Sequence, residues 1–434
     1  MKKFVVFCLS AVFAFTAFSF AGCQNGGGAL KIALDLEDEG RYDELFDYFT
    51  ETTGTEVSAT YGQDISKLIG TANEPDIIKT STVDILGMKE SFLPLNDYIE
   101  KSGMDTGDYI DSVMQALTID GNVYALPTSI NTSLLYYNKD MFDESAEEIR
   151  AALGLSENES VYPNDTWTWE DFRKAGIALT KTEGGAYTQF GCETQIKWWG
   201  EWLVYVNQAG GSFYEAGSDN KVCALDSPEA LEATEFFVKK SMGDETEKFA
   251  PNAIEAEGGF SFLSKKAAMI LGGHTGDWYS YDALGLNWDI AVLPTPVDNP
   301  DARGGEISAD AFGISVRSKK PDAAFEFLKL WAGEEGALKM YSYNKIGALK
   351  NMRELIAALP EEEQNGRDMD AFFAAVDKAV TLPAEQDFSK VCREIAMSEL
   401  YKLFITGRGS ETDVSAVLAR IKTNVDNYYK NLAA

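Results

Sequence analysis

Apolar and polar positions near the start of the chain follow first the period of a strand and then that of a helix. Residues 30–36 (LKIALDL) alternate as a strand does, and residues 42–49 place apolar side chains on one face of a helix that Gly54 ends. Residues 55–62 predict a second short strand. Strand, helix and strand at this spacing predict a βαβ unit and a mostly parallel sheet. The order recurs at residues 308–331, where a strand precedes a helix with Pro321 in its first turn.

Residues 124–140 (YALPTSINTSLLYYNKD) are apolar at both ends and polar but uncharged in the middle. A strand that leaves one core, crosses a water-filled gap and enters another needs this pattern. A second segment at 288–297 is also expected to join two cores, and two such crossings form a hinge between lobes. The length of 434 residues favours two domains. We therefore expect an N-lobe of residues 29–130 plus 289–335 and a C-lobe of residues 131–288 plus 336–434.

The N-terminus has the order of a secretory signal. Lys2 and Lys3 precede an apolar run from Phe4 to Ala21, which predicts a signal peptide over residues 1–22; a retained membrane anchor is the alternative. Residues 20–23 (FAGC) resemble the lipobox of bacterial lipoproteins, with Phe20 where leucine is usual. This resemblance implies that Cys23 is acylated, that residues 23–28 are a tether, and that the protein is lipid-anchored outside the cytoplasm on a bacterial membrane.

Charge narrows the possible partners. The sequence has 69 acidic and 38 basic residues, for a net charge of −31, which would repel nucleic acid and anionic lipid surfaces. A neutral or cationic small molecule is therefore the expected ligand. Beyond the N-terminal region three cysteines remain (Cys192, Cys223 and Cys392), so at most one disulfide can form among them.

Several segments, taken in order, resemble one family. They are PDII (75–78), GNVYALPTSINTSLLYYNKDMF (121–142), TWTWEDFRKAG (166–176), AAMILGG (267–273) with GDW (276–278), WDIAVLPTP (288–296) and the long segment 311–340. Together they are similar to the extracellular solute-binding proteins of carbohydrate ABC importers. The resemblance implies an α/β, two-lobe periplasmic-binding-protein-like fold, with a mixed, mostly parallel sheet in each lobe and hinge crossings. It also implies a carbohydrate held in the cleft, an ABC permease as partner, a monomer, and no cofactor, metal or catalytic residue.

Sugar binding needs aromatic rings for the C–H faces and fixed polar groups for the hydroxyls. Trp278 is the first choice for stacking because it lies in a glycine-rich loop after a strand. Asp277 and Thr275 share this loop, and so does His274, the only histidine, which either contacts ligand or has a structural role. By the resemblance, the segment with Trp198 and Trp199 borders the cleft.

Polar residues near strand ends complete the candidate site, because ligands of open α/β sheets gather there. Each could instead be an ordinary helix cap or a solvated charge. The candidates are Glu37 and Asp38 after the first strand, Thr80 and Asp84 after PDII, Asn131 in the first crossing and Asp310 beside the second.

Three other functions are alternatives to sugar transport. A glycosidase has paired carboxylates, but the sequence contains no G-x-S-x-G, H-E-x-x-H, Walker or C-x-x-C motif. The same fold could bind a cation such as a polyamine through acidic and aromatic side chains. A surface adhesin or scaffold would bind no small solute. The sequence favours a lipid-anchored, non-catalytic protein that delivers a sugar or oligosaccharide to a permease.

Overall fold

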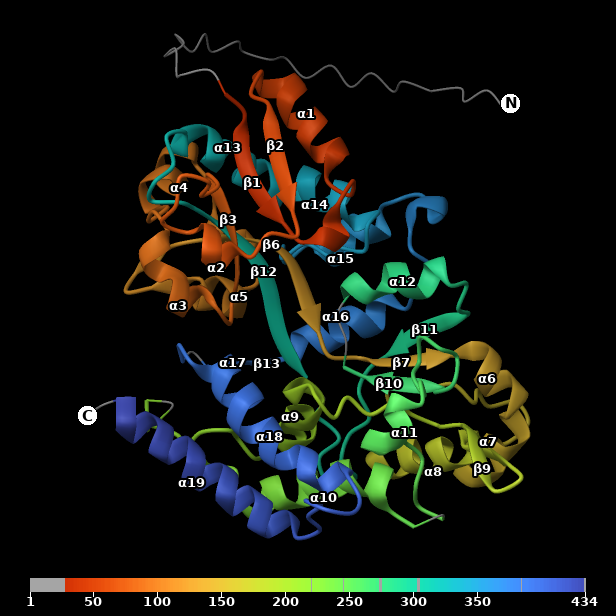
Figure 1. Ribbon diagram of the computed structural model, residues 1–434. Helices are drawn as coiled ribbons and strands as arrows, with labels where there is room; N and C mark the ends of the chain where they lie inside the picture. The colour runs from red at the N-terminus through yellow and green to blue at the C-terminus, as the bar shows by residue number, and fades with distance from the viewer. Residues whose placement is uncertain are drawn as a thin grey trace.

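Two α/β lobes lie one above the other, and strands run between them (Figure 1). The computed structural model describes residues 28–219, 221–244, 246–272, 275–302, 305–383 and 385–432. The predicted signal peptide, the acylation site Cys23, most of the tether and His274 lie outside these ranges.

The N-lobe is built on a mixed six-stranded sheet with the order β13-β12-β3-β1-β2, to which β6 adds by pairing with β12. Strand β1 is parallel to β2 and β3, whereas β12 is antiparallel to β3 and β6. Its strands are β1 (Leu30–Leu34), β2 (Val57–Tyr61), β3 (Ile77–Ser81), β6 (Leu126–Thr132), β12 (Glu306–Ile314) and β13 (Val380–Thr381). The predicted βαβ unit is confirmed, because α1 (Asp43–Thr53) joins the parallel strands β1 and β2.

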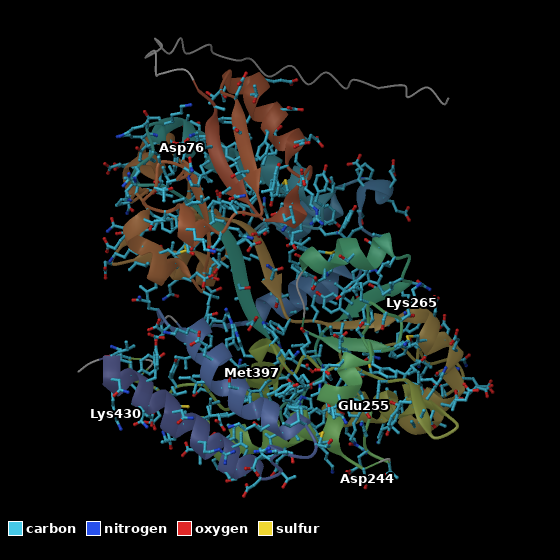
Figure 2. All side chains as sticks on the ribbon, viewed as in Figure 1. Asp76, Asp244, Glu255, Lys265, Met397 and Lys430 are labelled. Carbon is cyan, nitrogen blue, oxygen red and sulfur yellow. The ribbon has the colours of Figure 1, made fainter. Side chains whose placement is uncertain are left out.

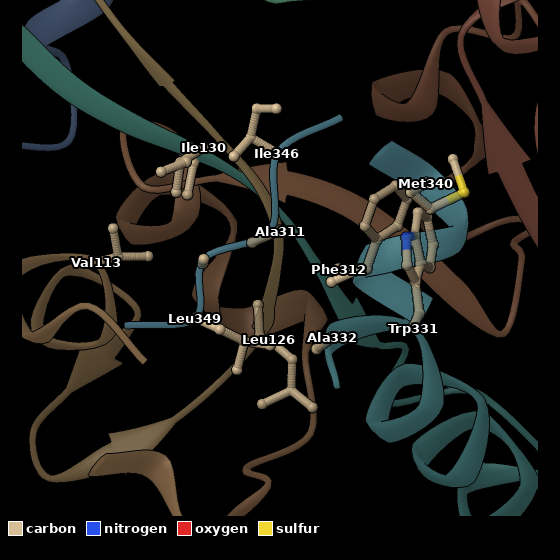
Figure 3. Packing of buried hydrophobic residues seen from close by; sticks show 14 of the residues in the cluster. Val113, Leu126, Ile130, Ala311, Phe312, Trp331, Ala332, Met340, Ile346 and Leu349 are labelled. Carbon is tan, nitrogen blue, oxygen red and sulfur yellow. The ribbon is translucent and has the colours of Figure 1, made fainter. Parts of the chain in front are cut away.

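Helices cover this sheet and supply much of the N-lobe core. Phe49 of α1 packs edge-on against Phe327 of α13 (Pro321–Ala332), with ring centroids 5.1 Å apart. Phe312 of β12 packs against Trp331 at 4.3 Å, and Met340 of α14 (Glu334–Tyr341) lies beside them (Figure 3). Further N-lobe elements are α2 (Ile65–Leu68), α3 (Ile85–Met88), α4 (Asn96–Ser102), α5 (Asp111–Ala116), β4 (Thr118–Ile119), β5 (Asn122–Val123) and α15 (Met352–Ala357).

The C-lobe contains a three-stranded sheet with the order β10-β7-β11, surrounded by helices and a second apolar core. Both strand pairings are antiparallel, so the expectation of a mostly parallel sheet in each lobe does not describe this one. Buried strands are equally apolar in either direction, and the sequence pattern therefore carries no sign of this difference. The strands are β7 (Leu135–Asn138), β10 (Met269–Leu271) and β11 (Trp288–Ala291).

Long helices form much of the C-lobe. Thr168 and Asp171 form a capping box at the start of α8. The principal helices are α8 (Trp169–Leu179), α9 (Trp199–Gln208), α10 (Pro228–Met242) and α19 (Val414–Leu432). Shorter elements are α6 (Lys139–Glu144), α7 (Ala146–Leu153), β8 (Lys181–Glu183), β9 (Ala186–Gln189), α11 (Ala253–Glu257), α12 (Trp278–Ala283), α17 (Phe388–Lys390) and α18 (Met397–Leu400).

Strand β6 leads directly from the N-lobe sheet into β7 of the C-lobe sheet, as the pattern over residues 124–140 predicts. The second crossing is β12, which pairs with β6 along its length, and it is not the segment 288–297 (Figure 1). Residues 288–291 form β11 and pair with β7 in the C-lobe. A third connection runs from α16 (Met369–Asp377) through β13, which pairs with the start of β12.

These pairings also move the lobe boundaries. Residues 289–291 belong with the C-lobe sheet, although the sequence placed them in the N-lobe. Helix α14 packs on α1 and α13 and therefore belongs to the N-lobe, although most of it was assigned to the C-lobe. The helix and strand patterns of these segments were visible in the sequence, but the partner of each was not.

Two further findings concern the described residues. None of their helices combines the length and apolarity needed to cross a bilayer. Cys192, Cys223 and Cys392 are all buried and unpaired. The described fold is therefore held by its two cores and not by a disulfide.

Candidate ligand site between the lobes

The carboxyl ends of β1 and β3 face the C-lobe. Asp76, just before β3, lies at the far side of the N-lobe, and the strand runs from there towards the gap between the lobes (Figure 2). A cavity of about 420 Å³ and another of about 390 Å³ lie in this region of the molecule. The smaller one is at these strand ends, where ligands of open α/β sheets bind. It is lined by Asp35, Lys79, Thr80, Ser81, Asp84 and Asp310, with Ile65, Ser66, Ile69 and Met88 from α2 and α3.

The polar groups of this N-lobe pocket are partly paired. Lys79 Nζ contacts Asp35 Oδ2 and lies 3.7 Å from Asp310 Oδ1. Burial alone would lower the pKa of Lys79, but the carboxylates of Asp310 and Asp35 outweigh it and hold this pKa above its ordinary value. The Asp84 carboxylate accepts a hydrogen bond from Ser81 Oγ at 2.7 Å. Thr80 Oγ1 is buried and has no hydrogen-bond partner among the described residues.

Polar side chains continue from this pocket along β6 to the C-lobe. Ser129 Oγ donates to Asp310 Oδ2 at 3.4 Å. Asn131 is two residues further on and therefore points to the same face of the strand. Its Oδ1 accepts hydrogen bonds from the backbone N–H and the hydroxyl of Thr275, both at 3.1 Å. The crossing strand thus connects the pocket to the C-lobe loop that precedes α12.

Trp198 is a half-buried aromatic ring beside this loop. Its indole lies over Gly200 and Gly272, and a Cβ at Gly272 would come within 2.6 Å of the ring. Gly272 has a φ of +89°, which also favours glycine, and its N–H donates to Leu134 O at 2.9 Å, next to the crossing strand. Gln195, whose amide donates to Leu271 O at 3.0 Å, completes the C-lobe side of the site.

A buried ion pair holds the segment that carries Trp198. The carboxylate of Glu201 accepts the backbone N–H of Gln195 at 2.7 Å and also contacts Lys240 Nζ. Both charged side chains are fully buried. Removing either partner would leave a buried charge unpaired, which is strongly destabilising.

Two of the predicted tryptophans lie in cores. Trp278 is 0% exposed, its Nε1 donates to Tyr136 Oη at 3.1 Å, and its ring packs edge-on against Trp288 at 5.6 Å. The prediction that it stacks on a ligand is therefore replaced by a core role in this structure, because no face of the ring is open. Trp199 is 8% exposed and packs edge-on against Phe388 at 5.3 Å, which leaves Trp198 as the aromatic candidate.

The remaining predicted residues lie in different surroundings. Asp38 is 2% exposed and forms an ion pair of 3.4 Å with Lys345, so its role is structural. Glu37 and Asp277 are exposed, and Asp277 makes no cap hydrogen bond to α12. The structure brings together Thr80, Asp84, Asn131, Thr275 and Asp310. Asp35, Lys79, Ser129 and Gln195 were not predicted as site residues; the charge of Lys79 directly after Ile77 and Ile78 was the one available signal.

The 420 Å³ cavity lies between α5, the end of α9 and residues 380–383. A small adjoining cavity includes Ile307, whose side chain is on the opposite face of β12 from Asp310. The polar groups of the larger cavity come from Ser112, Gln115, Asn207, Ser212, Tyr214 and Thr381, and none of its lining residues is charged. We favour the N-lobe pocket as the ligand site because it combines carboxylates with a cation.

The lobes also touch at the rim of the gap. The guanidinium of Arg41, after β1, lies 4.6 Å from the ring centroid of Tyr279 in α12. No group of three or more His, Cys, Asp or Glu side chains within the described ranges is arranged to hold a metal ion.

Comparison with known proteins shows the family to which the chain belongs. The family described as bacterial extracellular solute-binding protein matches residues 35–338, and the chain belongs to this family. The maltodextrin-binding protein MdxE of Bacillus subtilis (strain 168) is 23% identical over 367 residues, covering 82% of this chain and 79% of the relative.

Two solved structures share the fold. The ABC substrate-binding protein Lmo0181 of Listeria monocytogenes, in complex with cycloalternan, has a TM-score of 0.76 and 21% identity, covering 93% of this chain and 99% of that chain. UgpB of Mycobacterium tuberculosis, in complex with glycerophosphocholine, has a TM-score of 0.70 and 17% identity, covering 94% and 100%. These likenesses establish the two-lobed architecture, as the sequence predicted.

Replacing Trp278 tests its core position. Trp278→Ala removes a fully buried ring and should lower the free energy of unfolding by about 3–5 kcal/mol, measured by urea denaturation. Tyr279→Ala, at a 53% exposed neighbour, is the control and should cost at most about 1 kcal/mol. Equal stability of Trp278→Ala and the wild type would contradict the core assignment.

Glu193 should make stability depend on pH. Burial raises the pKa of Glu193 from 4.5 to about 7, so the folded state binds more protons than the unfolded state between these values. The free energy of unfolding should therefore fall as pH rises from 4.5 to about 7 and level off above. Glu193→Gln should make this fall shallower, as measured by urea denaturation at several pH values; Glu306, whose pKa burial also raises to about 7, preserves part of it. If the free energy of unfolding fell equally steeply with pH in the two proteins, the contribution of Glu193 would be refuted.

Proposed function

We propose that this protein captures an uncharged oligosaccharide between its lobes and delivers it to an ABC permease. The observation that carries the proposal is the continuous polar path from the N-lobe pocket to the C-lobe. Thr80 and Asp310 begin it, Asn131 lies on the crossing strand, and Trp198 ends it. The ligands of related proteins support a sugar as the ligand, because these relatives are named a maltodextrin-binding protein and arabinooligosaccharide-binding proteins.

The chemistry of these groups suits a sugar. Carboxylates of Asp84 and Asp310 accept hydrogen bonds from hydroxyls. The half-buried indole of Trp198 offers a surface for the apolar C–H face of a pyranose. No step in this function breaks a covalent bond, and we propose a binding protein rather than an enzyme.

Ligand capture would work by lobe closure. A ligand that contacts both the N-lobe pocket and the Trp198 segment binds the closed arrangement better than the open one and shifts the population towards it. The paired strands β6 and β12 would bend as the hinge. A permease would then recognise the closed form.

A cationic solute is the second candidate. Three aspartates line the N-lobe pocket, and one structural neighbour was solved with glycerophosphocholine, which carries a quaternary ammonium group. Binding of a cation would weaken steeply with salt, whereas stacking on a neutral sugar would not. The surface adhesin has no supporting observation in the structure.

Titration with ligand panels tests the proposed function. We expect an oligosaccharide from a panel of maltodextrins, cyclic glucans, arabinooligosaccharides and galactooligosaccharides to raise the melting temperature and to bind in calorimetry. Trp198→Ala should weaken this binding at least about tenfold, and Trp198→Phe, which keeps a ring, should retain most of it. Stabilisation by spermidine and by no sugar would contradict the proposed function. Equal affinity of Trp198→Ala and the wild type for the sugar would contradict the contact with Trp198.

We further propose that the monomer is held at the outer face of a membrane by lipid on Cys23. In cells fed radiolabelled palmitate, the wild-type protein should carry the label and Cys23→Ser should not. Because Cys23 precedes the fold, the ligand affinity of the variant should be unchanged, which serves as its control. Equal labelling of the two proteins would refute the lipid anchor.

A further inference from the structure

The N-lobe pocket contains a basic residue among its acidic ones, which sugar binding does not require. Asp35, Asp84 and Asp310 line it, and Lys79 is the one basic residue among the described residues that do so. Lys79 lies on β3, between β1 and β12 in the sheet. Its ammonium group reaches the carboxylates of Asp35, just after β1, and of Asp310, on β12.

We propose that Lys79 is a built-in counter-ion that lowers the affinity of this pocket for cationic ligands and so favours uncharged ones. The proposal rests on the proposed function, in that it takes this pocket as the ligand site. It concerns the class of ligand, not the identity of the sugar.

The position of Lys79 is what gives it this effect. Neighbouring strands of a sheet are about 4.8 Å apart, so a lysine on the middle strand can reach groups on both flanking strands. Asp35 and Asp310 retain 51% and 26% of their side-chain exposure. Without Lys79 they would face the cavity as two unpaired carboxylates, which is the arrangement that binds an ammonium group.

The charge of the whole chain makes such a device useful. A net charge of −31 attracts cations to the surface over long range. A local positive charge within the pocket opposes their entry at short range. Lys79 thus separates two effects, the attraction of cations by the protein and their binding at the site.

Spermidine binding to substituted proteins tests this inference. Lys79→Met keeps most of the length of the side chain and removes its charge. We expect calorimetry at low salt to show that this variant binds spermidine at least about tenfold more tightly than the wild type does. Lys79→Arg keeps the charge and should behave as the wild type does. Lys67→Met changes net charge equally but alters an exposed residue of α2 that pairs with Asp64, so it should show no gain.

A double variant assigns the gained affinity to the pocket. Asp310→Asn in the Lys79→Met background should remove most of the gain, and the gained binding should weaken when sodium chloride is raised from about 50 to about 500 mM. Circular dichroism and melting temperature show whether each variant is folded. Lys79→Met is expected to fold, because Asp35 and Asp310 remain partly exposed to water.

The result distinguishes this inference from the proposed function. If folded Lys79→Met gains no spermidine binding, or if Lys67→Met gains as much, the role of Lys79 is refuted even when the wild type binds an oligosaccharide. If Lys79→Met gains spermidine binding while no sugar binds the wild type, the counter-ion role stands and the sugar proposal falls. A wild type that binds spermidine as tightly as Lys79→Met would also overturn the inference.

Discussion

The antiparallel pairing of β6 with β12 is the constraint on which the rest of the molecule depends. A strand that leaves one core for another must keep its backbone N–H and C=O groups bonded on the way, and these two strands satisfy each other from Ile307 opposite Thr132 to Phe312 opposite Leu126. The ribbon is apolar where it enters the N-lobe core and polar where Ser129, Asn131 and Asp310 lie. An irregularity of register between Asp310 and Ala311 marks a point at which the ribbon can bend. The apolar cluster of the N-lobe continues past this ribbon, because it also contains Tyr136, Trp278 and Trp288.

The same ribbon explains why the candidate site lies where it does. Its polar face carries Asp310 into the N-lobe pocket and Asn131 to the C-lobe loop at Thr275. The C-lobe contribution is then fixed by close packing, since the indole of Trp198 can lie flat only over residues without a side chain, Gly200 and Gly272. Charge is divided between two scales: the surface is strongly acidic, whereas within the pocket Lys79 offsets part of the negative charge of Asp35 and Asp310. A neutral ligand with many hydroxyls meets both conditions.

Local patterns in the sequence predicted the features that are themselves local. The βαβ unit around α1 and the crossing over residues 124–140 both follow from spacing within one segment. The second crossing was misplaced because residues 288–291 and β12 both look like strands, and only pairing with β7 or β6 distinguishes them. Trp278 was misassigned for a similar reason: its loop looked exposed, but Tyr136 and Trp288 bury it. Lys79 was missed because its partners Asp35 and Asp310 are distant in sequence and meet it only across the folded sheet.

The most direct test of this account measures the distance between the lobes with and without ligand. Spin labels can be placed on Glu51→Cys of α1 and Glu235→Cys of α10, which are exposed positions on different lobes. The three described cysteines are buried, and Cys8→Ser and Cys23→Ser remove the other two. Pulsed electron paramagnetic resonance should show that a saturating oligosaccharide shortens and narrows the distance distribution, because the hinge formed by β6 and β12 closes. A distribution that stays the same while calorimetry shows the ligand bound would contradict the account.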